Sequence, residues 1–455
     1  MTVEVSPEQT QMFESPVKGE EPVKLEETAA EEKKAEVSDG KDPSSDHSPT
    51  VVERSPSFKE ESNFLSDLKE SERRALFELQ SKLEEAIAEG NLLKKDSKEE
   101  LDQEARDFNN EDFSIWGVPL LPSKGGKSTD VVLLKFLRAR EFKVKDAFEM
   151  LKNTLRWRKE TKVDSILHEE DLRDEFGKAG FINGLDREGH PVCYNVLGVF
   201  QDAEMSRIVF GSDEGRKKFL RSRVQLMEQG IKELDMRPGG VSSLLHITDL
   251  KDVIGLSKKE VRDTIKQAVH LLQDNYPEFV ARNVIINAPF WYYALNAILS
   301  PFLTQRTKSK FVVVRPAKVT ETLLKYISPE AIPTQYGGLK RENDNEFSME
   351  EGRVLELTVK AASSGTIEIP ALETGTTLLW DFLVLGWEVN YTAEFVPSDE
   401  GSYTIIVQKG KRIASQEEPI RNSFRNNEPG KVILTIENST LKKKRVFYRY
   451  KVICA

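Results

Sequence analysis

The sequence predicts an α/β domain with a helical subdomain before it, an all-β sandwich behind it and a disordered acidic tail in front. The 455-residue chain is too long for one ordinary core. Strand and helix patterns alternate through its middle, whereas its last quarter contains short β-branched or aromatic runs. The boundaries that we expect are 1–57 for the tail, 58–165 for the helical subdomain, 166–340 for the α/β domain and 343–455 for the sandwich.

The tail carries most of the formal net charge of −10, with fourteen acidic and six basic side chains in residues 1–57. A segment so poor in apolar residues cannot offset its ordering entropy, which predicts disorder. Four Ser-Pro pairs are candidate phosphorylation sites, at Ser6, Ser15, Ser48 and Ser55. Ordinary linker dipeptides explain these pairs equally well.

Helical periodicity follows the tail. Apolar residues recur at three- and four-residue steps from Phe58 to Ile87, and Gly90 ends that run. An apolar cluster at 115–121 would anchor the chain to a folded body. Two further helices are expected, at 129–140 and 144–159.

Strands and helices then alternate, which is typical of an α/β sheet with helices packed on it. The expected strands are 192–196, 243–248, 283–287 and 310–314. The expected helices are 213–235, 257–274, 289–300 and 319–327.

The C-terminal part contains seven short runs separated by turn residues, which indicates an antiparallel sandwich. The runs are 354–359, 366–369, 378–385, 387–395, 403–408, 431–436 and 446–452.

Motifs for catalysis, metals and nucleotides are missing from the sequence. The five histidines form no close-spaced metal pair, and no G-x-S-x-G elbow accompanies them. Gly125-Gly126-Lys127-Ser128 resembles the end of a phosphate loop, but Leu121 stands where that loop needs glycine. No basic run is interleaved with stacking aromatics, which argues against nucleic acid. We therefore expect neither an enzyme nor a bound metal or cofactor.

Two distant cysteines indicate a reducing compartment rather than a disulfide framework. We find no signal peptide at the N-terminus and no apolar run of the ~20 residues that a membrane span needs. The expected location is the cytoplasm, with peripheral contact to membranes.

Four segments together resemble the CRAL-TRIO lipid-transfer family over about residues 115–340. They are Leu134-Lys135-Phe136-Leu137-Arg138-Ala139-Arg140-Glu141-Phe142, the turn at 186–192, Asn275-Tyr276-Pro277-Glu278, and Ile285-Ile286-Asn287-Ala288-Pro289-Phe290 with Pro301-Phe302-Leu303 after it. The acidic tail and a GOLD-like sandwich ending in 442–450 narrow the resemblance to the plant patellins. That family implies phosphoinositide binding and membrane trafficking at the cell plate during cell division.

The resemblance also implies a headgroup site. The family's inositol-binding positions fall on Arg140, Glu278, Thr307 and Lys310. A lysine suits a phosphate, a threonine can donate to an oxygen, and a glutamate accepts from ring hydroxyls. The alternative is that Arg140 and Glu278 form only a structural salt bridge.

The family's phosphatidylcholine-binding positions are not kept. Leu244, His246 and Cys193 stand there, and Phe279 replaces an arginine after the glutamate. Binding of phosphatidylcholine in the family's usual manner is therefore not expected.

A nearly all-apolar helix beginning at residue 290 is expected to close an acyl-chain cavity above the strands at 243–248 and 283–287. Its lid residues are Phe290, Trp291, Tyr292, Leu295, Ile298, Leu299 and Phe302. The alternative is a plain core helix.

Four cations in the sandwich, Lys442, Lys443, Lys444 and Arg445, are candidates for contact with an anionic membrane. They would serve equally well as a solvated strand edge. The resemblance thus implies a non-enzymatic phosphoinositide-binding protein of vesicle trafficking. The alternative is a scaffold whose GOLD domain binds protein partners, with lipid as a structural ligand.

Overall fold

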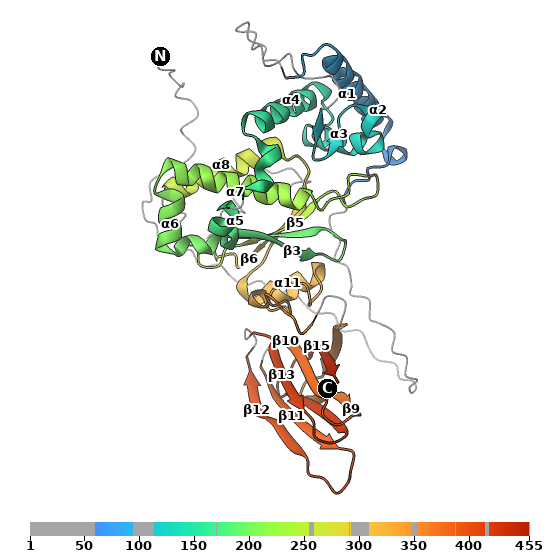
Figure 1. Cartoon of the computed structure of the whole chain (residues 1–455), viewed down its shortest axis with the longest axis vertical. Helices are drawn as coiled ribbons and strands as arrows, with labels where there is room; N and C mark the ends of the chain where they lie inside the picture. The colour runs from blue at the N-terminus through green and yellow to red at the C-terminus, as the bar shows by residue number, and fades with distance from the viewer. Residues whose placement is uncertain are drawn as a thin grey trace, which may run out of the picture. The chain divides into compact units, whose positions relative to one another are not determined.

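The computed structural model describes residues 60–93, 113–169, 171–253, 259–290, 292, 309–347, 353–386, 388–414 and 418–454. The expected tail and its four candidate phosphorylation sites, Ser6, Ser15, Ser48 and Ser55, lie outside these ranges. Within them the fold class is confirmed: helices come first, then a mixed α/β sheet, then antiparallel sheets (Figure 1).

The N-terminal helices pack around one apolar cluster. They are α1 (Glu70–Ala88), α2 (Pro122–Gly125), α3 (Lys127–Ala139) and α4 (Val144–Glu160). The cluster at 115–121 contributes Trp116, whose ring lies 5.8 Å from the ring of Phe136 on α3 and 4.5 Å from that of Phe279. Because Phe279 belongs to the α/β part, this aromatic contact joins the helices to the sheet.

The central sheet has the order β3-β4-β5-β6-β7, antiparallel at its first pair and parallel elsewhere. Its strands are β3 (Gly180–Leu185), β4 (Pro191–Val196), β5 (Leu244–Asp249), β6 (Val280–Ile286) and β7 (Phe311–Val313). The helices after α4 are α5 (Asp171–Phe176), α6 (Ala203–Phe210), α7 (Asp213–Ile231), α8 (Lys259–Asn275) and α11 (Val319–Tyr326). In Figure 1, α7 and α8 lie over one face of the sheet and α11 over the other.

The two faces of this sheet differ in chemistry. Side chains such as Tyr194 and Ile247 join a buried apolar cluster with Leu323 and Leu324 of α11. Strand alternation places Cys193 and His246, which are register partners, on the opposite face. Burial lowers the pKa of His246 to about 4, so its imidazole is neutral at physiological pH.

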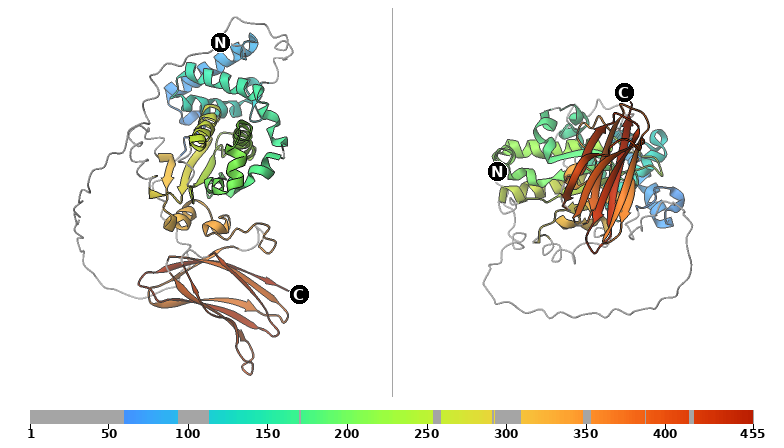
Figure 2. Two further views of the ribbon diagram at one scale, coloured as in Figure 1. Left: turned by 90° about the vertical axis from the view of Figure 1, so that its left-hand side faces the viewer. Right: turned by 90° about the horizontal axis from the view of Figure 1, so that it is seen from below.

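The C-terminal part consists of two four-stranded antiparallel sheets, in the orders β13-β10-β15-β8 and β12-β11-β14-β9. The strands are β8 (Leu355–Val359), β9 (Ser363–Ala371), β10 (Thr377–Leu385), β11 (Val389–Pro397), β12 (Ile405–Ile413), β13 (Ile420–Arg425), β14 (Gly430–Asn438) and β15 (Lys444–Ile453). Figure 2 shows these strands running side by side. Side chains from both sheets, among them Trp380, Tyr391 and Leu434, form one buried core. The sequence did not predict β13.

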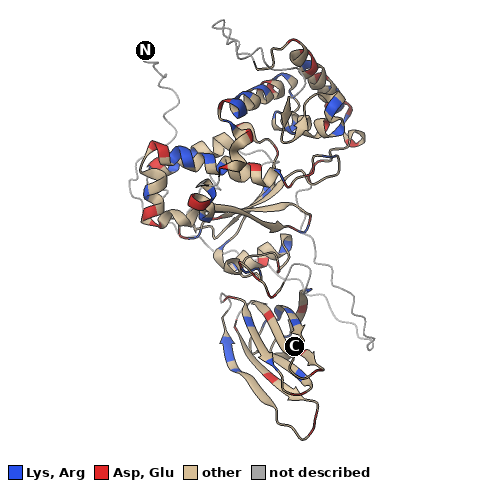
Figure 3. Ribbon diagram, viewed as in Figure 1, with Lys and Arg blue, Asp and Glu red and all other residues tan. Residues whose placement is uncertain are grey.

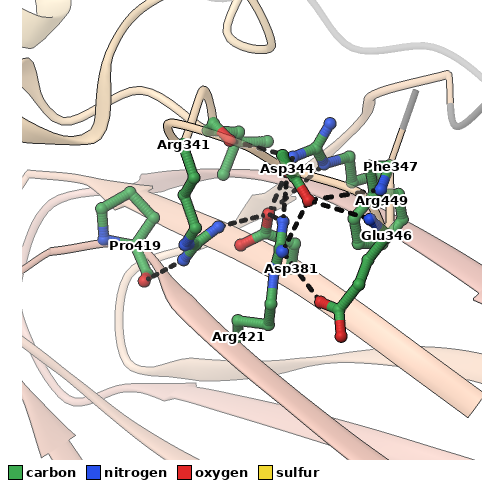
Figure 4. A network of polar contacts seen from close by, with 9 residues as sticks. Arg341, Asp344, Glu346, Phe347, Asp381, Pro419, Arg421 and Arg449 are labelled. Carbon is green, nitrogen blue, oxygen red and sulfur yellow. Dashed lines mark hydrogen bonds and ion pairs between the residues drawn. The ribbon is translucent and has the colours of Figure 1, made fainter. Parts of the chain in front are cut away.

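A buried charge network ties the segment before the sandwich to its strands (Figure 4). The carboxylate of Asp381 is completely buried on β10 and accepts hydrogen bonds from Arg341 at 2.7 Å, Arg421 at 2.8 Å and Arg449 at 3.0 Å. Asp344 shares Arg421 and Arg449. Because each guanidinium meets at least one carboxylate, the burial of these charges is compensated.

Candidate lipid-binding site

Glu278 stands at the sharp turn between α8 and β6. Its backbone adopts a left-handed conformation with φ of +55°, which is uncommon for a residue with a side chain. Two residues earlier, the hydroxyl of Tyr276 donates to Glu228 at 2.7 Å, and Glu228 also accepts from Arg158. The buried ring of Tyr276 thus fixes the chain just before the glutamate.

Lys310 lies immediately before β7 and reaches the same turn. Its Nζ is 2.7 Å from Oε2 of Glu278, and the two side chains are only 16% and 20% exposed. The pair joins residues 32 positions apart because β6 and β7 are parallel neighbours. It presents one cation and one carboxylate side by side, which together match a phosphate and hydroxyl groups.

Of the other two expected headgroup residues, the structure describes only Arg140. Arg140 ends α3, and its guanidinium donates to the carbonyl of Ala139 at 3.2 Å. Among the described residues we find no contact between Arg140 and Glu278, so the salt bridge considered from sequence is replaced by Lys310–Glu278. Thr307 lies outside the described residues.

The expected lid falls largely outside the described residues, as do Trp291, Leu295, Ile298, Leu299 and Phe302. Of the two that are described, Phe290 is 87% exposed. Tyr292 packs on a small apolar cluster of Leu250, Ile285 and Ala288. The closing lid therefore stays a prediction.

Three residues near the pair were missed by the sequence analysis. Lys135 of α3 is 3% exposed and donates from Nζ to the carbonyl of Glu278 at 2.9 Å. Glu60 and His190 form an ion pair at 3.2 Å nearby in the fold. Lys135 and His190 belong to the motifs that carry the family resemblance, but no local pattern indicates that they are buried.

The candidate membrane cluster of the sandwich needs a correction. Lys444 opens β15 and is only 1% exposed, because its stem packs beside Gly386, which has no side chain to fill that space. Arg445 forms an ion pair with Glu356 at 2.5 Å. Lys442 and Lys443 remain exposed, so of the four expected cations one is buried and one is held by a partly exposed ion pair.

A second exposed basic stretch lies on the edge strand β12. Lys409 and Lys411 are exposed there, and part of the ribbon of this strand is blue in Figure 3. Beside them in sequence, Tyr403 is 91% and Ile406 59% exposed. The sequence analysis did not predict this mixture of exposed cations and apolar side chains.

Comparison with known proteins identifies the parts of the chain. Family models match at residues 75–153 (CRAL/TRIO, N-terminal domain), 175–338 (CRAL/TRIO domain) and 360–444 (Patellin-1-like, C-terminal GOLD domain). The chain is 47% identical to Patellin-4 of Arabidopsis thaliana, over 99% of both chains. It belongs to the patellin family.

Other patellins are similar as well. Patellin-3 of Arabidopsis thaliana is 48% identical over 87% of this chain and 78% of its own length. The SEC14 cytosolic factor of Candida glabrata is 30% identical over 46% of this chain and 70% of its own. As a patellin with a CRAL-TRIO domain, the protein is a lipid-binding or lipid-transfer protein. Within the described ranges no helix is both long and apolar enough to cross a bilayer.

Proposed function

We propose that this patellin binds a phosphoinositide headgroup with Glu278 and Lys310, and that Thr307 and Arg140 complete the site when lipid is present. The observation that carries the proposal is the half-buried pair at 2.7 Å. Lys310 would contact the phosphodiester, and Glu278 would accept hydrogen bonds from inositol hydroxyls. Both groups keep a charged partner in the absence of lipid, which limits the cost of partial burial.

Acyl chains would supply most of the binding energy. Each buried methylene contributes ~0.8 kcal/mol, so the headgroup contacts are needed for selectivity more than for affinity. A lid that opens at the membrane would let the lipid enter.

We further propose that the protein acts peripherally on membranes in vesicle trafficking, including cell-plate formation during cell division. The accessible cations Lys442 and Lys443, together with Lys409 and Lys411 of β12, support contact with an anionic leaflet at about 1 kcal/mol per cation. Protein partners of the GOLD domain are the alternative. A truncation at about residue 343 that keeps lipid transfer but loses cellular targeting would favour that alternative.

A vesicle sedimentation assay tests the headgroup site. Lys310→Ala combined with Thr307→Ala should weaken binding to phosphatidylinositol vesicles about tenfold or more, since a charged hydrogen bond is worth ~1.5–3 kcal/mol. Lys318→Ala is the control, because it removes the same charge from an exposed lysine paired with Glu321. Equal binding by both folded variants and the native chain would rule out the site.

A further inference from the structure

The described chain begins with a short acidic segment that lies against the α/β domain. We call residues Glu60–Asn63 the strap. Arg138 on α3 is only 9% exposed and contacts three residues of the strap. It donates to Oδ1 of Asn63 and to the carbonyl of Ser62, both at 2.6 Å, and its Nε lies 2.8 Å from the carboxylate of Glu61.

Glu60 reaches from the strap into the α/β domain. Its carboxylate accepts a hydrogen bond from Ser243 and lies 3.2 Å from Nε2 of His190. On the other side of the imidazole, Nδ1 lies 2.9 Å from Asp186. Burial raises the pKa of Glu60, but the bonds from His190 and Ser243 outweigh it and lower the pKa to about 2. Glu60 is therefore a carboxylate at physiological pH.

Lys135 connects the region around Glu60 to the turn that carries Glu278. Its buried Nζ donates to the carbonyl of Ser242 at 2.7 Å and to that of Glu278 at 2.9 Å, and lies 4.2 Å above the ring of Phe279. Ser242 also receives a bond from Asn63 of the strap at 3.4 Å. Lys135 thus holds two backbone carbonyls, that of Ser242 beside the strap and that of Glu278 in the turn.

We infer that the strap and Lys135 are positioning residues for the headgroup site, holding Glu278 in its left-handed turn so that its carboxylate faces Lys310. The left-handed backbone of Glu278 is costly for a residue with a side chain and needs support from its surroundings. Lys135 supplies that support at the carbonyl of the strained residue. The strap supplies a nearby negative charge that favours the charged form of the buried lysine.

The pKa of Lys135 depends on its burial and on four charged groups nearby. Burial lowers the pKa of Lys135 to about 7, while the carboxylates of Glu60 and Glu278 raise it and the cations Arg138 and Lys310 lower it. Neutralising Glu60 removes one of the two supporting carboxylates. The ammonium of Lys135 then loses its proton at a lower pH, and its hydrogen bonds to the two carbonyls weaken.

The test uses the full chain, first without lipid. Hydrogen exchange of the backbone amides in 276–283 reports how firmly the turn is held. Glu60→Gln with Glu61→Gln, and separately Lys135→Met, should each speed exchange there several-fold. Glu84→Gln with Glu85→Gln is the matched control, because it removes the same charge from exposed positions of α1. Unchanged exchange in both test variants would overturn the inference.

Two further readouts separate positioning from general destabilisation. Glu60→Asp keeps the charge and should restore slow exchange in part, whereas the Gln variant should shift the pH dependence of exchange in 276–283 to lower pH. A Gln variant with an unshifted pH profile would contradict the role of Glu60.

Binding to phosphatidylinositol vesicles is then measured on the same variants. This arm rests on the proposed function and should show about tenfold weaker binding for Lys135→Met. Faster exchange with unchanged vesicle binding would confirm the positioning of Glu278 and remove Glu278 from the headgroup site. The failure of one proposal is therefore distinguishable from the failure of the other.

Discussion

His190 should stay protonated far above the pH at which histidine ordinarily loses its proton. Its buried imidazole lies between the carboxylates of Asp186 at 2.9 Å and Glu60 at 3.2 Å. Burial lowers the pKa of His190, but hydrogen bonds and attraction to both carboxylates raise it to about 10. The difference from the ordinary value of 6.5 corresponds to about 5 kcal/mol in favour of the charged form.

The sign of the stability effect follows from this raised pKa. An imidazolium that is favoured in the folded state contributes its full stability below about pH 6.5, and that contribution is lost as pH rises toward 10. The free energy of unfolding should therefore fall over this window in the native chain. His190→Gln should be less stable at neutral pH and should show a flatter pH dependence.

Nuclear magnetic resonance of the histidine Cε1 positions measures this directly. The chain has five histidines, so the spectrum is simple, and His190→Gln assigns the relevant signal. We expect that signal to keep its protonated shift at about pH 8, because the pKa of His190 is raised to about 10. A midpoint for His190 at or below 6.5 would refute the reasoning.

Three other predictions concern stability. Asp381→Asn should lower the free energy of unfolding of the sandwich by about 3–5 kcal/mol, because three guanidinium groups lose their shared buried carboxylate. The control Glu356→Gln removes one partner of an exposed ion pair and should cost less than about 1 kcal/mol. Equal urea midpoints for the two variants would contradict this prediction. Burial raises the pKa of Asp344, but Arg421 and the other partners of this carboxylate lower it to about 2. The free energy of unfolding should therefore fall by about 2 kcal/mol as the pH falls from 3.8 to 2. Asp344→Asn should lack that loss in an acid titration. Leu434→Ala in the sandwich core should cost about 2–5 kcal/mol in a denaturant titration, and a cost below about 1 kcal/mol would show that the core closes over the cavity.

The spacing of apolar residues predicted most helices and strands, because the buried face of each element determines that spacing. The helix expected at 144–159 is α4 (Val144–Glu160), and the strand expected at 192–196 is β4 (Pro191–Val196). The strand β13 was missed because it lies at a sheet edge and carries Arg421, Asn422 and Ser423, which leave no alternation of apolar and polar residues.

The candidate site was only partly predictable. The family resemblance points to both Glu278 and Lys310, but the salt bridge considered as an alternative from the sequence joined Glu278 to Arg140. Contacts between Glu60 and His190 join residues 130 positions apart. No local pattern encodes such a contact, since it depends on how the helices dock on the sheet.

The pairing of Lys310 with Glu278 has a consequence for discrimination between ligands. A lysine that is already paired with a neighbouring carboxylate attracts a lone inorganic anion weakly, because the anion must compete with that carboxylate for the ammonium. A ligand gains from the pair only if it brings hydrogen-bond donors for the glutamate together with acceptors for the lysine. The carboxylate beside the lysine would thus disfavour simple inorganic anions and favour molecules in which a ring of hydroxyl groups and a phosphate are joined.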